Sequence, residues 1–282
     1  MLFPENIGRH LSIDEVAITN GELWTVLTNK AKHGKNGALV AMVEGTKSSA
    51  IARVLSAIPR EKRNVVTEVT MDMAETMEVV TRTVFPRATI TIDRFHVQQL
   101  VSEAVQEIRI ELRREATREE NERIKKTRAE GAPYHAVIFK NGDTKKQLLA
   151  RSRYLLFQPM SRWNDQQHER ATILFQNYPV LKIAYNLSML FRACYEHNTT
   201  VAGARASLVA WYQQVEEKKL DSFLVPMESI RLHEQTILNY FIHRSTNASA
   251  ESFNAKLKNF RTVVRGVQDK AFHLFRIAKL YG

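Results

Sequence analysis

Residues typical of β-strands are concentrated in the first third of the chain. Short segments rich in β-branched and aromatic residues are bounded by turn residues, which predicts strands rather than helices. An Asn20-Gly21 pair separates the first two segments, and this dipeptide is a strong hairpin signal. The first three segments are therefore expected to form an antiparallel meander. The predicted strands cover residues 10–18, 22–28, 38–44, 64–71 and 88–92.

Apolar residues repeat with helical spacing between and after these strands. Single apolar stripes predict helices over residues 46–58 and 73–85, and a proline follows each of them. Residues 94–129 carry dense charge over a weak apolar stripe, which predicts one long solvated helix. Glycine and proline then predict a loop over residues 130–145, and residues 146–241 are predicted to be helical.

The order of these elements favours one α/β architecture. Three antiparallel strands, a helix, a strand, a helix and a strand are the order of a ribonuclease H-like fold, a mixed five-stranded sheet with flanking helices. A large all-helical insertion would interrupt it. We expect residues 1–96 to form the core with strands 1–5, residues 97–243 the insertion, and residues 244–282 the C-terminal core helices.

The composition is that of a folded, basic protein. Apolar residues make up 44% of the 282 residues and charged residues 25%, which argues against extensive disorder. The 41 Lys and Arg residues exceed the 30 Asp and Glu residues, and the formal charge of +11 points to a polyanionic partner, most simply nucleic acid. The one cysteine, Cys194, excludes an intrachain disulfide and a cysteine-based zinc site, and it fits a reducing, cytoplasmic setting. The sequence has no transmembrane or secretory pattern, so we expect no membrane partner.

Two aspartates stand where predicted strands would bring them together. Asp14 lies inside the first strand, and Asp72 ends the fourth. Because these strands are neighbours in a ribonuclease H-like sheet, the two carboxylates would lie side by side, and a divalent cation would relieve their repulsion. The alternatives are that Asp14 is an exposed strand residue and that Asp72 caps the following helix.

A third carboxylate precedes a run of cations near the C-terminus. One face of the predicted helix is apolar and consists of Phe253, Leu257, Phe260 and Val264. Glu251 begins a second face, which continues with Asn254, Lys258, Arg261 and Arg265. Residues 252–282 carry seven Lys and Arg side chains and one Asp. This face would therefore offer an acid at the helix N-terminus and phosphate ligands beyond it, with Lys256, Lys258, Arg261 and Arg265 as the candidate DNA-binding residues. An ordinary amphipathic helix is the alternative.

Four motifs occur in a fixed order. They are Val-Thr-Met-Asp-Met around Asp72, Phe85-Pro86-Arg87-Ala88, Asp93-Arg94-Phe95-His96-Val97, and the segment from Asn247 to Lys258 followed by Arg265-Gly266. Their combination resembles bacterial insertion-sequence transposases with a DDE catalytic domain, most closely the ISL-three family. The resemblance extends from about residue 10 to the end of the chain.

The resemblance implies a set of site residues. In that family two aspartates and a glutamate hold two divalent ions, Mg²⁺ or Mn²⁺, and by position these residues are Asp14, Asp72 and Glu251 here. Asp93 also follows a predicted strand and competes with Asp72; we favour Asp72 because its strand adjoins the first. His96 is expected to hydrogen-bond Asp93 at a helix start, with this pair lying beside the metal ligands, and direct metal ligation by His96 is the alternative.

The resemblance also implies an activity, which is metal-dependent cleavage and strand transfer of DNA at insertion-sequence ends. The alternatives are a catalytically inactive transposase-derived DNA-binding protein and a ribonuclease H-like, Mg²⁺-dependent nuclease. We expect a homo-oligomer on DNA. Family members generally carry N-terminal zinc-binding and helix-turn-helix segments, so we also expect a separate N-terminal DNA-recognition polypeptide or a truncated protein. Trp163 and Trp211 are expected in the core of the insertion, with stacking on an unpaired base as the alternative.

Overall fold

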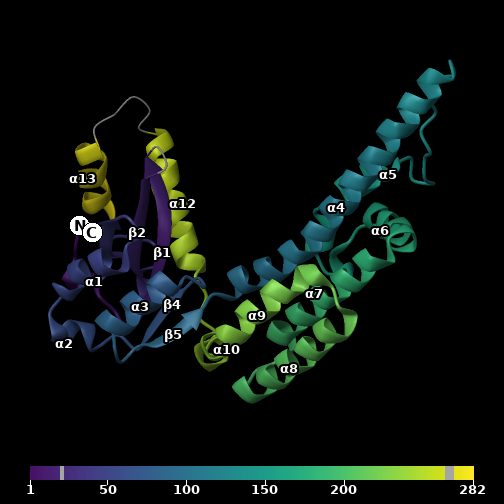
Figure 1. Ribbon diagram of the computed structural model, residues 1–282. Coiled ribbons are helices and arrows are strands. Elements are labelled where there is room, and N and C mark those ends of the chain that lie inside the picture. The colour runs from purple at the N-terminus through teal and green to yellow at the C-terminus, as the bar shows by residue number, and fades with distance from the viewer. Residues whose placement is uncertain (20–21, 264–269) are drawn as a thin grey trace. The chain divides into compact units, whose positions relative to one another are not determined.

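A five-stranded mixed sheet forms the centre of the first of two compact units (Figure 1). The computed structural model describes residues 1–19, 22–263 and 270–282. The first unit comprises Met1–Val97 and His233–Gly282, and the second comprises Gln98–Leu232. In the sheet order β3-β2-β1-β4-β5, β4 is parallel to β1 and β5, whereas β2 is antiparallel to β1 and β3. The strands are β1 (His10–Thr19), β2 (Glu22–Asn29), β3 (Leu39–Glu44), β4 (Glu68–Met71) and β5 (Thr89–Ile92).

The five predicted strands and the ribonuclease H-like order are confirmed, with one changed boundary. β4 begins at Glu68 rather than at residue 64, because Arg60–Arg63 forms a short helix, α2, whose end at Asn64 keeps helical backbone angles. The predicted hairpin turn at Asn20-Gly21 lies outside the described residues. Two short 3₁₀ helices flank the first strands, η1 (Pro4–Asn6) and η2 (Lys30–Lys32).

Different helices cover the two faces of the sheet. α1 (Ser48–Ser56) and α3 (Glu75–Val84) lie within the predicted ranges, contact each other, and pack on β3 and β4. α1 connects β3 to β4, and α3 connects β4 to β5, so both crossovers run in the same direction across the sheet. Right-handed connections then place both helices on one face. The other face is covered by α12 (Ala248–Val263) and α13 (Lys270–Tyr281). Its apolar cluster joins strand residues to helix residues and includes Val16, Trp24, Val26, Met42, Phe253, Leu257 and Ile277.

Short helices connect the second unit back to the sheet unit. α10 (Glu234–Leu238) contacts β5, and α11 (Tyr240–His243) follows it. The side chain of Asn239, between them, donates a 2.8 Å hydrogen bond to the carbonyl of Ile90. The first unit therefore resumes at His233, whereas the boundary expected from the sequence follows residue 243.

The second unit is built from helices, as predicted. α4 (Arg94–Ala129) has the predicted bounds, and Thr144 and Asn164 form capping boxes at the starts of α5 and α6. Trp163 and Trp211 are buried, and each indole N–H donates to a backbone carbonyl, of Leu155 and Leu187 respectively. Both are core residues, as expected. The remaining elements are α5 (Lys145–Arg151), η3 (Leu155–Phe157), η4 (Met160–Arg162), α6 (Asp165–Asn177), α7 (Pro179–His197), α8 (Val201–Lys218), η5 (Asp221–Phe223) and α9 (Leu224–Leu232).

A helix that spans a membrane must be long and strongly apolar. None of the helices that the structure describes combines the necessary length and hydropathy.

Candidate functional site

Three aspartates stand at one level across three neighbouring strands. Ser12 of β1 pairs with Thr70 of β4, which in turn pairs with Thr91 of β5. Two residues further along each strand direction come Asp14, Asp72 and Asp93. Because side chains alternate between the faces of a sheet, all three carboxylates belong to the face that carries Ser12, Thr70 and Thr91. The register thus brings Asp93 to the same level as Asp72 and Asp14.

Glu251 reaches this edge of the sheet from α12. One ligand atom each from Asp93, His96 and Glu251 lies within 4.8 Å of the other two. The His96 Nε2 atom is 3.9 Å from Glu251 Oε1, and it is buried without a hydrogen-bond partner. The structure describes no hydrogen bond between Asp93 and His96, so the arrangement differs from the hydrogen-bonded pair expected from the sequence. His96 instead faces the glutamate, with Asp93 close to both.

Asp14 lies in the electrostatic field of the same group. Burial raises its pKa above the usual value, and the hydrogen bond from the Glu15 amide opposes this increase. The negative charges of Asp72 and Glu251 raise the pKa of Asp14 further, whereas His96 lowers it. Asp14 is thus coupled to Asp72 just after β4, to His96 of α4 and to Glu251 of α12, although it is not one of the three residues whose ligand atoms converge within 4.8 Å.

Local hydrogen bonds orient the other two aspartates. Asp72 Oδ1 accepts from the Ala74 amide at 3.1 Å, and α3 starts only at Glu75 with Ala74 as its N-cap. Asp72 is therefore not the helix cap that was considered from the sequence. Asp93 is buried, and its Oδ1 lies 3.4 Å from the Phe95 amide at the start of α4. Both side chains are held by one backbone amide and keep a second carboxylate oxygen.

The comparison with protein families gives one match. A model of ISL-three type DDE transposases, described as "Transposase", matches residues 11–277. The chain belongs to this transposase family. Comparisons with curated proteins and with solved structures gave no match. Membership implies DNA binding and the use of a divalent metal.

The residues at the candidate site suit a hard divalent cation. Mg²⁺ and Mn²⁺ prefer carboxylate oxygens, and this edge of the sheet offers them from Asp14, Asp72, Asp93 and Glu251. The buried, unpartnered His96 Nε2 is a further donor in the 4.8 Å group. An acidic cluster that is partly buried costs free energy without a counter-ion, so the donor set fits such an ion.

A polar layer lies on the same face of the sheet as the aspartates, two to four residues earlier along the strands. The Lys30 ammonium donates to Thr70 Oγ1 at 2.7 Å and lies 3.7 Å from Glu68 Oε1. Burial lowers the pKa of Lys30, whereas Glu68 and Asp93 raise it. Lys30 therefore places a positive charge close to Asp93, on the sheet side of the candidate site.

This layer was not predicted from the sequence, although the chain contains its signal. Polar residues alternate with apolar ones from His10 to Asp14 in β1, and in β4 and β5 up to the residue that follows each strand. The polar positions are His10, Ser12 and Asp14, then Glu68, Thr70 and Asp72, then Thr89, Thr91 and Asp93. Three neighbouring strands with one such face predict a shared polar surface. The candidate site lies where this surface reaches the C-terminal ends of β4 and β5.

The candidate DNA-binding cations differ in their surroundings. Lys256 is exposed, but its ammonium donates to the Gly34 carbonyl at 2.9 Å. Lys258 is exposed on α12. The side chain of Arg261 and the whole of Arg265 lie outside the described residues. A DNA-binding role for the four residues stays a prediction.

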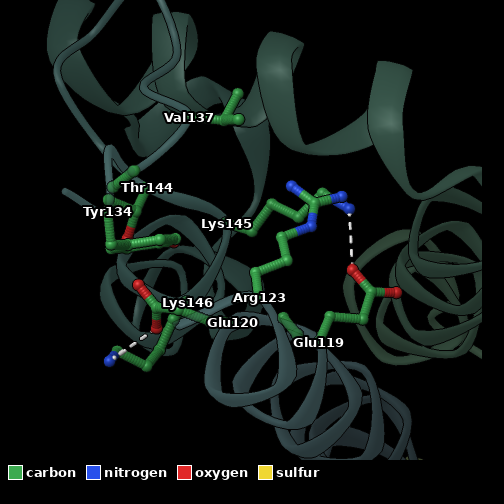
Figure 2. A pocket seen from close by; sticks show the side chains of 10 residues that line it. Glu119, Glu120, Arg123, Tyr134, Val137, Thr144, Lys145 and Lys146 are labelled. Carbon is green, nitrogen blue, oxygen red and sulfur yellow. Dashed lines mark hydrogen bonds and ion pairs between the residues drawn. The ribbon is translucent and has the colours of Figure 1, made fainter. Parts of the chain in front are cut away.

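A pocket in the second unit has a different chemistry (Figure 2). It is lined by residues of α4, of the following loop and of the start of α5. Two ion pairs border it, Lys145 with Glu119 at 3.0 Å and Lys146 with Glu120 at 2.8 Å. Because acids and bases are paired across it, this pocket has none of the unbalanced negative charge of the site on the sheet.

Proposed function

We propose that this chain is the catalytic domain of an insertion-sequence transposase that cleaves DNA and joins the freed 3′ end to a target. One observation carries the proposal. Asp14, Asp72 and Asp93 occupy matching positions along the neighbouring strand directions of β1, β4 and β5, and α12 contributes Glu251. Family membership supplies the DNA substrate. Because that substrate is genomic DNA, we place the reaction in the bacterial cytoplasm.

In this proposal the metal ligands are Asp14, Asp72 and Glu251. Asp93 and His96 lie beside Glu251 and are not ligands themselves. When bound, a pair of divalent ions would activate the attacking oxygen and offset the charge on the leaving oxygen. Asp14 would ligate through lone pairs that its two hydrogen bonds leave available. Glu251 is half-buried, so its carboxylate can turn toward either the aspartates or His96.

The test of the proposal uses conservative replacement of each acid. Asp14→Asn, Asp72→Asn and Glu251→Gln should each lower Mn²⁺-dependent nicking of plasmid DNA by roughly 100-fold or more, because a ligand is lost while the shape is kept. Glu75→Gln, an exposed change three residues after Asp72, should be neutral. Nicking and strand transfer of a pre-cut DNA end are measured for each variant, and DNA binding is measured separately.

Each alternative predicts a different result. A DNA-binding protein without catalysis would give no metal-dependent nicking in the wild type. A nuclease would nick DNA but would not join pre-cut ends. An active Asp72→Asn variant combined with an inactive Asp93→Asn variant would assign the second ligand to Asp93.

A further inference from the structure

Asn254 joins the helix that carries Glu251 to the strand that carries Asp14. Its Nδ2 donates a 2.7 Å hydrogen bond to Asp14 Oδ2 across 240 positions of sequence. Asn254 is 6% exposed, and it follows Glu251 by three residues on the same side of α12. The sequence grouped it with the cationic face, but the structure buries it against β1.

The two oxygens of Asp14 are held by different parts of the chain. Oδ1 accepts from the Glu15 amide at 2.8 Å, within β1, and Oδ2 accepts from Asn254, on α12. A hydrogen bond at each oxygen fixes the rotation of a carboxylate, which a single bond does not. The Asn254 bond is therefore the contact that ties the orientation of Asp14 to the docked position of α12.

Only one end of the Asn254 side-chain amide, the Nδ2 group, has a hydrogen-bond partner in the structure. Its Oδ1 atom is buried and has no hydrogen-bond partner, which is uncommon for a side chain this deeply buried. Asn247, one turn before Glu251, is fully buried, and neither of its side-chain polar atoms has a partner. Buried polar side-chain atoms without partners thus lie on both sides of Glu251 in the sequence, at Asn247 just before α12 and at Asn254 within it.

We propose that Asn254 is a positioning residue of the metal site, which orients the Asp14 carboxylate for ligation. The proposal rests on the assignment of Asp14 as a metal ligand under Proposed function. Asn254 touches no reacting atom in this proposal, because its contribution passes through Asp14. Removing a hydrogen-bond partner that orients a metal ligand typically lowers metal affinity 10–100-fold.

Binding of Mn²⁺ alone tests the proposal without DNA or turnover. Asn254→Leu keeps the size of the side chain and removes the donor, and it should lower Mn²⁺ affinity about tenfold in calorimetric titration. Asn259→Leu, an exposed change on the same helix, should leave the affinity unchanged. The thermal midpoint of each metal-free variant shows whether it is folded, and Asn254→Ala replaces the leucine variant if that one does not fold.

Double variants separate positioning of Asp14 from a general effect on α12. In an Asp14→Ala background, Asn254→Leu should have no further effect on Mn²⁺ affinity, whereas in a Glu251→Gln background it should still lower it. The reverse pattern would mean that Asn254 acts by placing Glu251, and it would overturn the proposal. An unchanged affinity for Asn254→Leu in the wild-type chain would overturn it as well. Equal affinities for wild type and Asp14→Ala would instead refute the ligand assignment under Proposed function.

Discussion

At the scale of single residues, the site is defined by unfavourable interactions among its acids. Burial raises the pKa of Asp14, and the charges of Asp72 and Glu251 add to this effect. A raised pKa means that the folded chain resists ionisation of Asp14 relative to an exposed carboxyl group. A divalent cation would reverse that preference, since the charged form is the one that ligates. The partly buried ammonium of Lys30, near Asp93, offsets part of the same repulsion.

The cysteine illustrates the opposite case, a buried group with no chemical role in the proposal. Cys194 is 2% exposed, and burial raises the pKa of its thiol to about 12. The thiolate fraction near pH 8 is thereby roughly 1000-fold lower than for a free thiol. We expect labelling of the native chain by a thiol reagent to be correspondingly slow, and the single thiol to react rapidly after unfolding in guanidinium.

The same pKa fixes the direction of a stability change. The unfolded chain ionises its thiol above about pH 9, whereas the folded chain stays protonated up to about pH 12. The stability contributed by protonated Cys194 is therefore complete below pH 9 and is lost as the pH rises toward 12. Cys194→Ala should remove this part of the alkaline loss in denaturant titrations. Rapid native labelling near pH 8 would contradict the described burial.

At the scale of elements, local patterns predicted more of the fold than of the site. β-branched segments and helical stripes identified the five strands, α1, α3 and α4, because each pattern reflects the face that its own element buries. The expected set of Asp14, Asp72 and Glu251 followed from strand ends and family motifs. The roles of Asn254 and Lys30 were not predicted, since they depend on contacts with Asp14 and Glu68, which local periodicity cannot reveal.

The cations of α12 provide a test at this scale. Lys258 is exposed, whereas the Lys256 ammonium is engaged by the Gly34 carbonyl. If Lys258 contacts a phosphate, Lys258→Ala should weaken binding to all DNA sequences and reduce the slope of log affinity against log salt by about one unit. Lys256→Ala should instead lower the free energy of unfolding by about 1 kcal/mol, because a hydrogen bond to the backbone is lost.

The matched control lies on another helix. Lys47, exposed at the N-terminus of α1, belongs to the opposite face of the sheet, so Lys47→Ala should leave the salt slope unchanged. Fluorescence anisotropy of a labelled duplex over a range of salt concentrations gives the slopes for the wild type, Lys258→Ala and Lys47→Ala. Equal slopes for Lys258→Ala and the wild type would remove Lys258 from the DNA-binding surface.

At the scale of the whole molecule, the proposed ligands belong to one unit although they come from distant parts of the sequence. Asp14, Asp72 and Asp93 precede the second unit in the chain, and Glu251 follows it. The chain leaves the sheet unit after Val97 and returns at His233, before completing the site with α12. The family match covers this entire course, which agrees with a site that needs both ends of the chain.

This arrangement predicts where a metal ion stabilises the protein. A ligand that binds only the native site raises the free energy of opening by RT ln(1 + [L]/Kd), or about 2.7 kcal/mol at 100 times Kd. We therefore expect Mn²⁺ to slow amide hydrogen exchange in β1, β4, β5 and α12, read by mass spectrometry of peptides. Exchange in α6, α7 and α8 should change much less, because local opening there breaks contacts within the second unit. Asp14→Asn should lose the protection in all four elements together. Protection centred on the helices of the second unit would place the metal elsewhere and contradict the ligand set.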